Sequence, residues 1–178
     1  DLNGGYISWK NKLICLLLVI GCLTVSADIL SGQTNPGKAD WHPEEGMDGK
    51  NVPWITTPQA LVDKMLEMAG LSPEDLLIDL GSGDGRLVIS AAKLGAKAIG
   101  VEYNPDLVKF SRQNAVREGV ARKVQFVEGD IFEYDFSKAT VISMFLLPEI
   151  NMKLRSKLLN MKAGSRIVSN TFTMQEWE

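Results

Sequence analysis

Glycines and acidic side chains in the middle of the chain have a spacing that suits the binding of a nucleotide. Residues 79–86 read DLGSGDGR, with three glycines at alternate positions and an acid two positions before the first glycine. Glycines let backbone approach a ligand closely, and the start of a helix offers N–H groups that lack a partner within the helix. We therefore predict a ligand-binding turn between a strand and a helix. Its residues are Asp79, Gly81, Ser82, Gly83, Asp84, Gly85 and Arg86.

The glycine spacing excludes two familiar nucleotide sites. The dinucleotide fingerprint places its third glycine three residues after the second, whereas Gly85 follows Gly83 by two. A P-loop needs Lys and then Ser or Thr after its glycines, but Arg86 and Leu87 stand there. A strand–helix turn with a purely structural role remains the alternative.

Two more acidic residues are placed to reach the same ligand. Glu102 follows the apolar segment 98–101 and lies 23 residues after Asp79. An acid about 20 residues beyond a glycine turn is suited to accept hydrogen bonds from ribose hydroxyl groups. Asp130 ends another strand-like segment, 124–130. Each acid also has a simpler interpretation, as a solvated strand end for Glu102 and as a turn residue for Asp130.

These residues need a scaffold that brings several strand ends together, and the chain alternates strand-like with helix-like segments. Strands are predicted at 76–78, ended by Asp79, and at 98–101, 124–130, 140–149 (with its exit) and 165–172. Helices are predicted to begin at Pro58, Arg86, Pro105 and Pro148, with Thr57 and Asn104 as N-caps. The alternation predicts an α/β fold with a Rossmann-like, doubly wound and mostly parallel sheet.

Helical spacing also predicts which side chains face the sheet. For the helix that begins at Pro58 they are Leu61, Val62, Met65, Leu66 and Ala69. For the helix that begins at Pro105 they are Leu107, Val108, Ala115 and Val116.

The glycine turn with its acids, together with the segment 52–71 (VPWITTPQALVDKMLEMAGL), resembles class I S-adenosylmethionine-dependent methyltransferases. Within that class the chain is similar to the lysine methyltransferases of the ATP synthase c-subunit and to archaeal protein-lysine methyltransferases. The likeness covers about residues 52–178 and implies S-adenosyl-L-methionine as cofactor, with Thr57 and Pro58 close to it. On spacing alone, the same segment leads into a helix that only covers the sheet.

The resemblance assigns further contacts around the adenosine. Asp130 would meet the adenine amino group and Ile131 would pack on the ring, while Tyr103, next to the ribose-binding Glu102, also belongs to the cofactor site. A complete fold of this class has seven strands. The resemblance therefore also predicts that the C-terminal strands, after the fifth, are missing.

The fourth strand ends beside the transferred methyl group in this fold, so the residues there bear on the substrate. DNA and glutamine N-methyltransferases carry Asn or Asp, two prolines and an aromatic residue at this point, whereas this chain has Phe145-Leu146-Leu147-Pro148. We predict that Phe145 lines a channel for a lysine ammonium and that Glu149 attracts this cation or takes its proton. The alternatives are core packing for Phe145 and a helix-dipole interaction for Glu149.

Composition limits the remaining functions. The 178 residues suit one domain, and the formal net charge of −3 at pH 7 provides no basic field for nucleic acid. With Cys15, Cys22 and His42 as the complete set of Cys and His, no metal site is predicted. The resemblance to lysine methyltransferases therefore implies transfer of methyl groups to protein lysine. A small-molecule methyltransferase and an inactive exported cofactor-binding domain remain the alternatives.

The N-terminal region has the pattern of an export signal. Lys10 and Lys12 precede the apolar segment 13–25, which is too short to span a bilayer. A signal peptide over 1–27 is predicted, with a lipoprotein signal at Cys22 or an uncleaved membrane anchor as alternatives. A linker at 28–51 and the methyltransferase domain at 52–178 would follow. The protein would then be exported or membrane-anchored, with catalysis on the cytoplasmic side in the case of an anchor.

Overall fold

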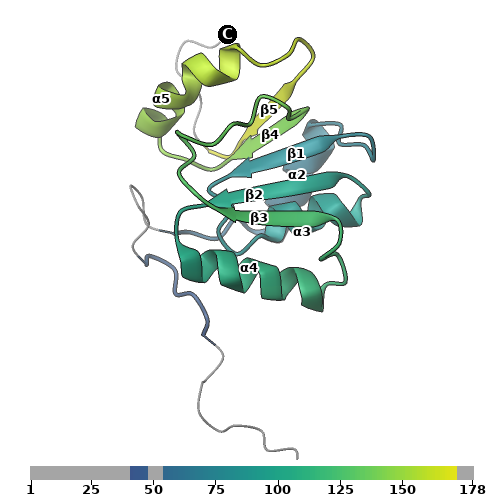
Figure 1. The fold of residues 1–178 in the computed structure, drawn as a ribbon, viewed down its shortest axis with the longest axis vertical. Helices are drawn as coiled ribbons and strands as arrows, with labels where there is room; N and C mark the ends of the chain where they lie inside the picture. The colour runs from purple at the N-terminus through teal and green to yellow at the C-terminus, as the bar shows by residue number, and fades with distance from the viewer. Residues whose placement is uncertain (1–40, 48–53, 172–178) are drawn as a thin grey trace, which may run out of the picture. The chain divides into compact units, whose positions relative to one another are not determined.

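The computed structural model of the chain describes residues 41–47 and 54–171. These residues form a five-stranded sheet and its covering helices (Figure 1). The strands are β1 (Leu76–Leu80), β2 (Lys97–Glu102), β3 (Val124–Glu128), β4 (Val141–Met144) and β5 (Arg166–Ser169). The helices are α2 (Gln59–Met68), α3 (Arg86–Lys93), α4 (Pro105–Arg117) and α5 (Pro148–Leu159).

The predicted signal segment 1–27 and most of the predicted linker 28–51 lie outside the described residues. Within the ranges 41–47 and 54–171, no helix combines the length and the apolar character that a membrane crossing requires.

The order of the strands places a ligand crevice next to β1. Neighbouring strands are parallel throughout, in the order β3-β2-β1-β4-β5. The chain moves outward from β1 to β3 and then returns to the other side of β1 for β4 and β5. In doubly wound sheets, ligands bind beyond the carboxyl ends of the strands where this direction changes. The predicted Rossmann-like parallel sheet is confirmed.

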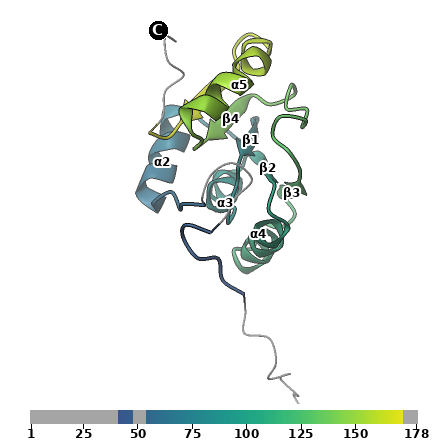
Figure 2. The ribbon, with the colours of Figure 1, turned by 90° about the vertical axis from the view of Figure 1, so that its left-hand side faces the viewer.

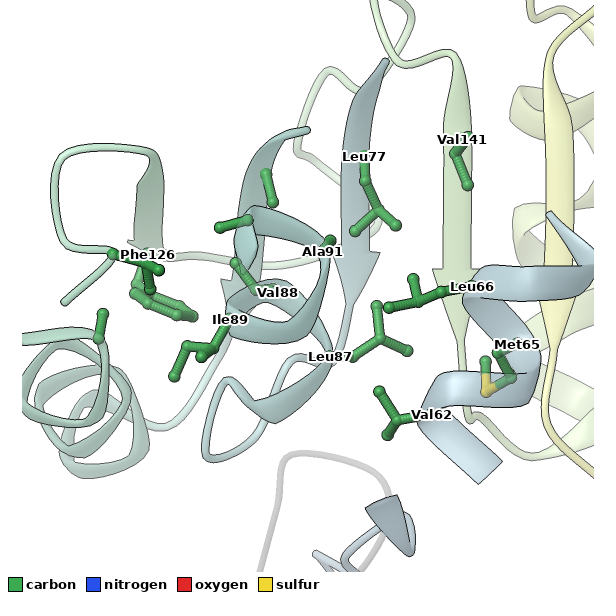
Figure 3. Packing of buried hydrophobic residues seen from close by; sticks show 14 of the residues in the cluster. Val62, Met65, Leu66, Leu77, Leu87, Val88, Ile89, Ala91, Phe126 and Val141 are labelled. Atoms are coloured by element: carbon green, nitrogen blue, oxygen red, sulfur yellow. The ribbon is translucent and has the colours of Figure 1, made fainter. Parts of the chain in front are cut away.

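Helices cover both faces of this sheet (Figure 2). Along β1, side chains alternate between the faces, so Leu77 packs with α2, α3 and α4, whereas Ile78 and Leu80 pack with α5. Figure 3 shows Leu77 and Val141 on the sheet, with side chains of α2 and α3 packed near them. Burial of one such leucine side chain stabilises the fold by about 1.5–3 kcal/mol. The two apolar layers therefore hold the strand ends in register.

Several local predictions are wrong in detail. β3 ends at Glu128 and not at Asp130, and β5 covers Arg166–Ser169 and not 165–172. β1 continues through Asp79 to Leu80, because Leu80 is fully buried against the α5 side. Pro58, and not Thr57, is the N-cap of α2. Leu61 and Val116 are exposed, at 36% and 68%, since each lies at the outer margin of its helix face, about 100° around the helix from the adjacent buried residue, Val62 or Ala115.

The predicted starts of α3, α4 and α5 are confirmed. The side chain of Asn104 accepts hydrogen bonds from the backbone N–H groups of Asp106 and Leu107 and so caps α4. Gly85 is the N-cap of α3 with φ of 81°, a left-handed conformation that favours glycine. A Cβ at Gly85 would lie 2.6 Å from the ring of Phe126, which no side chain tolerates. This glycine therefore fixes the close packing of the turn against β3.

Candidate functional site

The carboxyl ends of β1, β2 and β4 open into one cleft. It measures about 1030 Å³, including the space open to solvent. The loops after these strands line the cleft, together with the segment 54–57 that precedes α2. From the predicted set, the cleft brings together Thr57, Asp79, Gly81, Ser82, Gly83, Asp84, Arg86, Glu102, Tyr103, Asp130, Ile131 and Phe145. Pro58, Gly85 and Glu149 are not among the lining residues.

Asp79 is the most deeply placed acid in the cleft. Asp79 is 6% exposed, and its Oδ1 accepts a hydrogen bond of 2.7 Å from the hydroxyl of Ser143, a fully buried residue. Burial raises the pKa of Asp79 to about 7; the Ser143 hydrogen bond opposes the rise and the negative charges of Glu102 and Asp84 add to it. Asp79 is therefore poised to pair with a cationic group of a ligand.

Glu102 ties the glycine turn to the end of β2. Its Oε2 accepts a hydrogen bond of 2.9 Å from the N–H of Gly83, and its Oε1 accepts one of 2.9 Å from the N–H of Asn104. Glu102 is 9% exposed and lines the cleft. Since a carboxylate offers about four lone-pair sites, these two bonds leave capacity for the hydroxyl groups of a ligand.

Fewer backbone N–H groups of the glycine turn are free to bind a ligand than the sequence predicts. The N–H groups of Gly81 and Ser82 donate to the carbonyl of Val101 at 2.9 and 3.1 Å. Those of Gly85 and Arg86 donate to Ser82 O and to Asp84 Oδ1, at 2.9 and 3.2 Å. With Gly83 bonded to Glu102, these five donors are already used within the protein. The expectation of free N–H groups at these positions is therefore wrong.

Asp84 and Arg86 form a pair at the rim of the cleft. Both oxygens of Asp84 accept from the guanidinium, with the shortest distance, 2.6 Å, to Nη2. The Nη1 group of Arg86 donates to the carbonyl of Thr57 at 2.8 Å. The pair thus anchors the segment before α2 to the glycine turn, and the positive charge of Arg86 is neutralised by Asp84.

The residues predicted to lie near an adenosine follow β2 and β3. Asp130 and Ile131 line the cleft, and Oδ1 of Asp130 accepts a 2.9 Å hydrogen bond from the N–H of Phe132. Tyr103 is 51% exposed at the rim. An acid followed by an apolar side chain can recognise a planar base through one edge and one face, so this part of the cleft suits a nucleoside.

Several lining residues escaped the sequence analysis. Nothing in the spacing of the sequence marks Trp54 or Leu146 as a site residue, and helical spacing predicts Met65 only as a sheet-facing residue of its helix. Ser143 lies in the middle of the apolar strand β4, where only its pairing with Asp79 in the neighbouring strand gives it a role. Its polar side chain within an otherwise apolar strand is the one feature of the sequence that could have marked Ser143 as a site residue.

Comparison with known proteins decides the family. The sequence model of the ANTKMT methyltransferase domain matches residues 79–178. A protein-lysine N-methyltransferase of Saccharolobus islandicus is 42% identical over 130 residues, which cover 71% of this chain and 81% of that protein. The chain belongs to the ANTKMT methyltransferase domain family. The predicted S-adenosylmethionine-dependent methyltransferase is thereby confirmed.

Other relatives of this family extend the likeness. The lysine N-methyltransferase of the ATP synthase c-subunit from Xenopus laevis is 38% identical over 71% of this chain, which spans only 54% of that relative's length. Among solved structures, an RNA methyltransferase from Salinibacter ruber, in complex with S-adenosyl-L-homocysteine, has a TM-score of 0.68. It is 49% identical to this chain, and the match covers 70% of this chain and 82% of that one.

The residues of this methyltransferase fit S-adenosylmethionine. Gly81 and Gly83 present backbone without side chains to the cleft, and a Cβ at Gly81 would lie 3.1 Å from Leu146 in the space that a ligand needs. Asp79 suits the ammonium group of the amino-acid tail, and Glu102 suits the ribose. Leu107, Ile131 and Met144 add apolar side chains to the lining of the cleft.

Proposed function

We propose that the cleft binds S-adenosylmethionine and that the enzyme transfers its methyl group to lysine side chains of proteins. The observation that carries this proposal is the gathering of Asp79, Glu102 and Asp130 around one cleft that a glycine turn borders. In this arrangement Asp79 holds the ammonium of the amino-acid tail, Glu102 accepts hydrogen bonds from the ribose, and Asp130 meets the adenine amino group.

The protein's own contribution to transfer is orientation and the exclusion of water. S-adenosylmethionine, when bound, supplies a methyl group on a positively charged sulfur. A lysine accepts a methyl only as the neutral amine, and its ordinary pKa is about 10.4. An apolar channel lowers that pKa because it destabilises the ammonium. Phe145, half-buried in the lining, provides such a wall and a ring face for the cation.

Glu149 acts further out in this proposal. It is exposed in the first turn of α5 and is not among the residues that line the cleft. Its carboxylate is placed to attract a cationic side chain on its way in, or to receive its proton, and not to touch the cofactor. The same position suits the helix dipole, so removal of Glu149 has to be judged by binding of substrate and not by stability alone.

Protein lysine is supported as the substrate by the names of two relatives, the Saccharolobus and Xenopus lysine methyltransferases. RNA is the second candidate, because the Salinibacter protein is described as an RNA methyltransferase. The formal net charge of −3 favours protein, since RNA phosphates attract proteins with a basic surface.

One labelling experiment separates these substrates. The full chain is incubated with S-adenosylmethionine that carries a labelled methyl group, and with a cell lysate divided into protein, RNA and small-molecule fractions. We expect label on lysine in the protein fraction, located by digestion and mass spectrometry, and its loss with Glu102→Gln. Label in RNA alone or in metabolites alone would reject the lysine proposal. Binding of S-adenosylhomocysteine without any transfer would indicate an inactive cofactor-binding domain.

We propose further that residues 1–27 direct the chain to a membrane or out of the cytoplasm. This proposal is supported by the basic flank and apolar segment of the sequence. Fractionation of cells that express the chain with and without these residues tests it, and identical distributions would reject it.

A further inference from the structure

Trp54 lies against the glycine turn, at the end of the cleft where the cofactor's amino-acid tail is expected. A Cβ at Gly83 would lie 2.4 Å from Nε1 of the indole and 3.1 Å from its Cδ1. The N–H edge of the ring therefore faces this turn, and Trp54 lines the same cleft as Asp79 and Glu102. Sequence spacing gave this residue no role.

The position of Trp54 is fixed by its neighbours. Its carbonyl accepts a 2.8 Å hydrogen bond from the N–H of Gly46, and its N–H donates at 2.9 Å to the carbonyl of Met47. Two residues later, Thr56 donates to the Glu45 carboxylate through both its N–H and its hydroxyl group. These bonds lower the conformational freedom of the backbone around the indole, so it forms a preorganised wall of the cleft.

A carboxylate in the amino-acid tail needs a donor, and five backbone N–H groups of the turn are already used. The N–H groups of Gly81, Ser82, Gly83, Gly85 and Arg86 all donate to acceptors within the protein. Arg86 is the one cation among the described residues that line the cleft, and its guanidinium is bonded to Asp84 and to the carbonyl of Thr57. The Ser82 hydroxyl is buried without a partner and lies against Gly100 of β2. The other side-chain donors next to the turn include the hydroxyl of Thr57 and the indole N–H of Trp54, for which no acceptor lies among the described residues.

We propose that the indole N–H of Trp54 donates a hydrogen bond to the carboxylate of the cofactor's amino-acid tail. The inference rests on the proposed binding of S-adenosylmethionine in this cleft. An indole is a donor only, so this contact selects an acceptor such as a carboxylate. Together, Asp79 for the ammonium group and Trp54 for the carboxylate recognise both ends of a zwitterionic amino acid. Trp54 thereby determines specificity for a cofactor with an intact tail.

Two ligands and one conservative variant test this contact. Trp54→Phe keeps an aromatic ring but removes the N–H donor. Calorimetry compares S-adenosylhomocysteine, which has the amino-acid tail, with 5′-methylthioadenosine, which lacks it. We expect the variant to bind S-adenosylhomocysteine about 10- to 100-fold more weakly, because a hydrogen bond to a charged group is lost. Its affinity for 5′-methylthioadenosine should stay within about twofold of the wild-type value.

The other outcomes are equally informative. An equal loss for both ligands would mean that Trp54 only packs against the nucleoside or supports the fold, and would overturn the inference. Unchanged or tighter binding of S-adenosylhomocysteine would overturn it too, the latter because the ring would then obstruct the tail. Thr57→Val serves as the comparison, since a larger loss there than in Trp54→Phe would assign the carboxylate to the threonine hydroxyl. If the wild-type chain binds neither ligand, the proposed function itself fails.

Discussion

The buried carboxylate of Asp79 should make the fold less stable at neutral pH than at pH 4. Burial, against the Ser143 hydrogen bond, raises its pKa from an ordinary 3.8 to about 7. The folded state therefore binds this proton more tightly than the unfolded state does. Its stabilising effect is complete below about pH 3.8 and is lost as the pH rises through about 7. The substitution Asp79→Asn removes this titration while keeping the shape and a partner for Ser143.

The size of the effect follows from the two pKa values. The difference between about 7 and 3.8, at about 1.36 kcal/mol per pKa unit, corresponds to about 4 kcal/mol. We expect the variant and the wild type to differ little at pH 4. By pH 8 the variant should be the more stable by up to about 4 kcal/mol, an upper value because local relaxation and water reduce burial costs. S-adenosylhomocysteine should bind the variant more weakly, since the anionic partner of its ammonium group is gone.

Urea unfolding at pH 4, 5, 6, 7 and 8 measures this difference, with midpoints compared at equal m values. Carboxylates that do not interact with Asp79 cancel in the comparison. For Asp75, burial acts to raise the pKa, but hydrogen bonds from Thr140 and Ser72 lower it overall, so its contribution changes with pH in the opposite sense and in both proteins alike. A stability difference that is constant from pH 4 to pH 8, or that favours the wild type at high pH, would refute the reasoning.

Three further substitutions separate stability from binding. Gly85→Ala would place a Cβ on a left-handed backbone, 2.6 Å from the ring of Phe126. It should lower the unfolding free energy by roughly 2–5 kcal/mol, and a thermal midpoint equal to that of the wild type would contradict this. Glu102→Gln replaces one of two accepting oxygens by a donor that faces a backbone N–H, so affinity for S-adenosylhomocysteine in calorimetry should fall at least about tenfold; unchanged affinity would argue against ribose binding. Arg166→Ala removes an ion pair to Asp75 and two hydrogen bonds to carbonyls at the amino ends of the strands. The unfolding free energy should fall by about 1–2 kcal/mol, while S-adenosylhomocysteine should bind as it does to the wild type. Weaker binding would show that this end of the sheet is coupled to the cleft.

Local sequence determined the elements and the outline of the site. Strands, turns and helix starts are set mainly by residues that are close together in the chain. The sequence could therefore predict the strand before Asp79, the glycine turn after it and the strand that ends at Glu102. The sequence predicted Asn104 as the N-cap of α4, and its side chain takes that role. These local rules also predicted the alternation of strands and helices along the chain. Such alternation favours a parallel sheet, because helices on both sides bury both of its faces.

Tertiary structure alone decided which groups stay available within the cleft. The N–H groups of the turn are bonded to β2, to Glu102 and within the turn itself, which no periodicity in the sequence records. Ser143 donates to Asp79, which lies 64 positions earlier in the chain, across neighbouring strands, and Trp54 reaches Gly83 from the segment before α2. The physical reason is that hydrogen bonding and desolvation depend on atoms in space, so they are set when distant segments pack together.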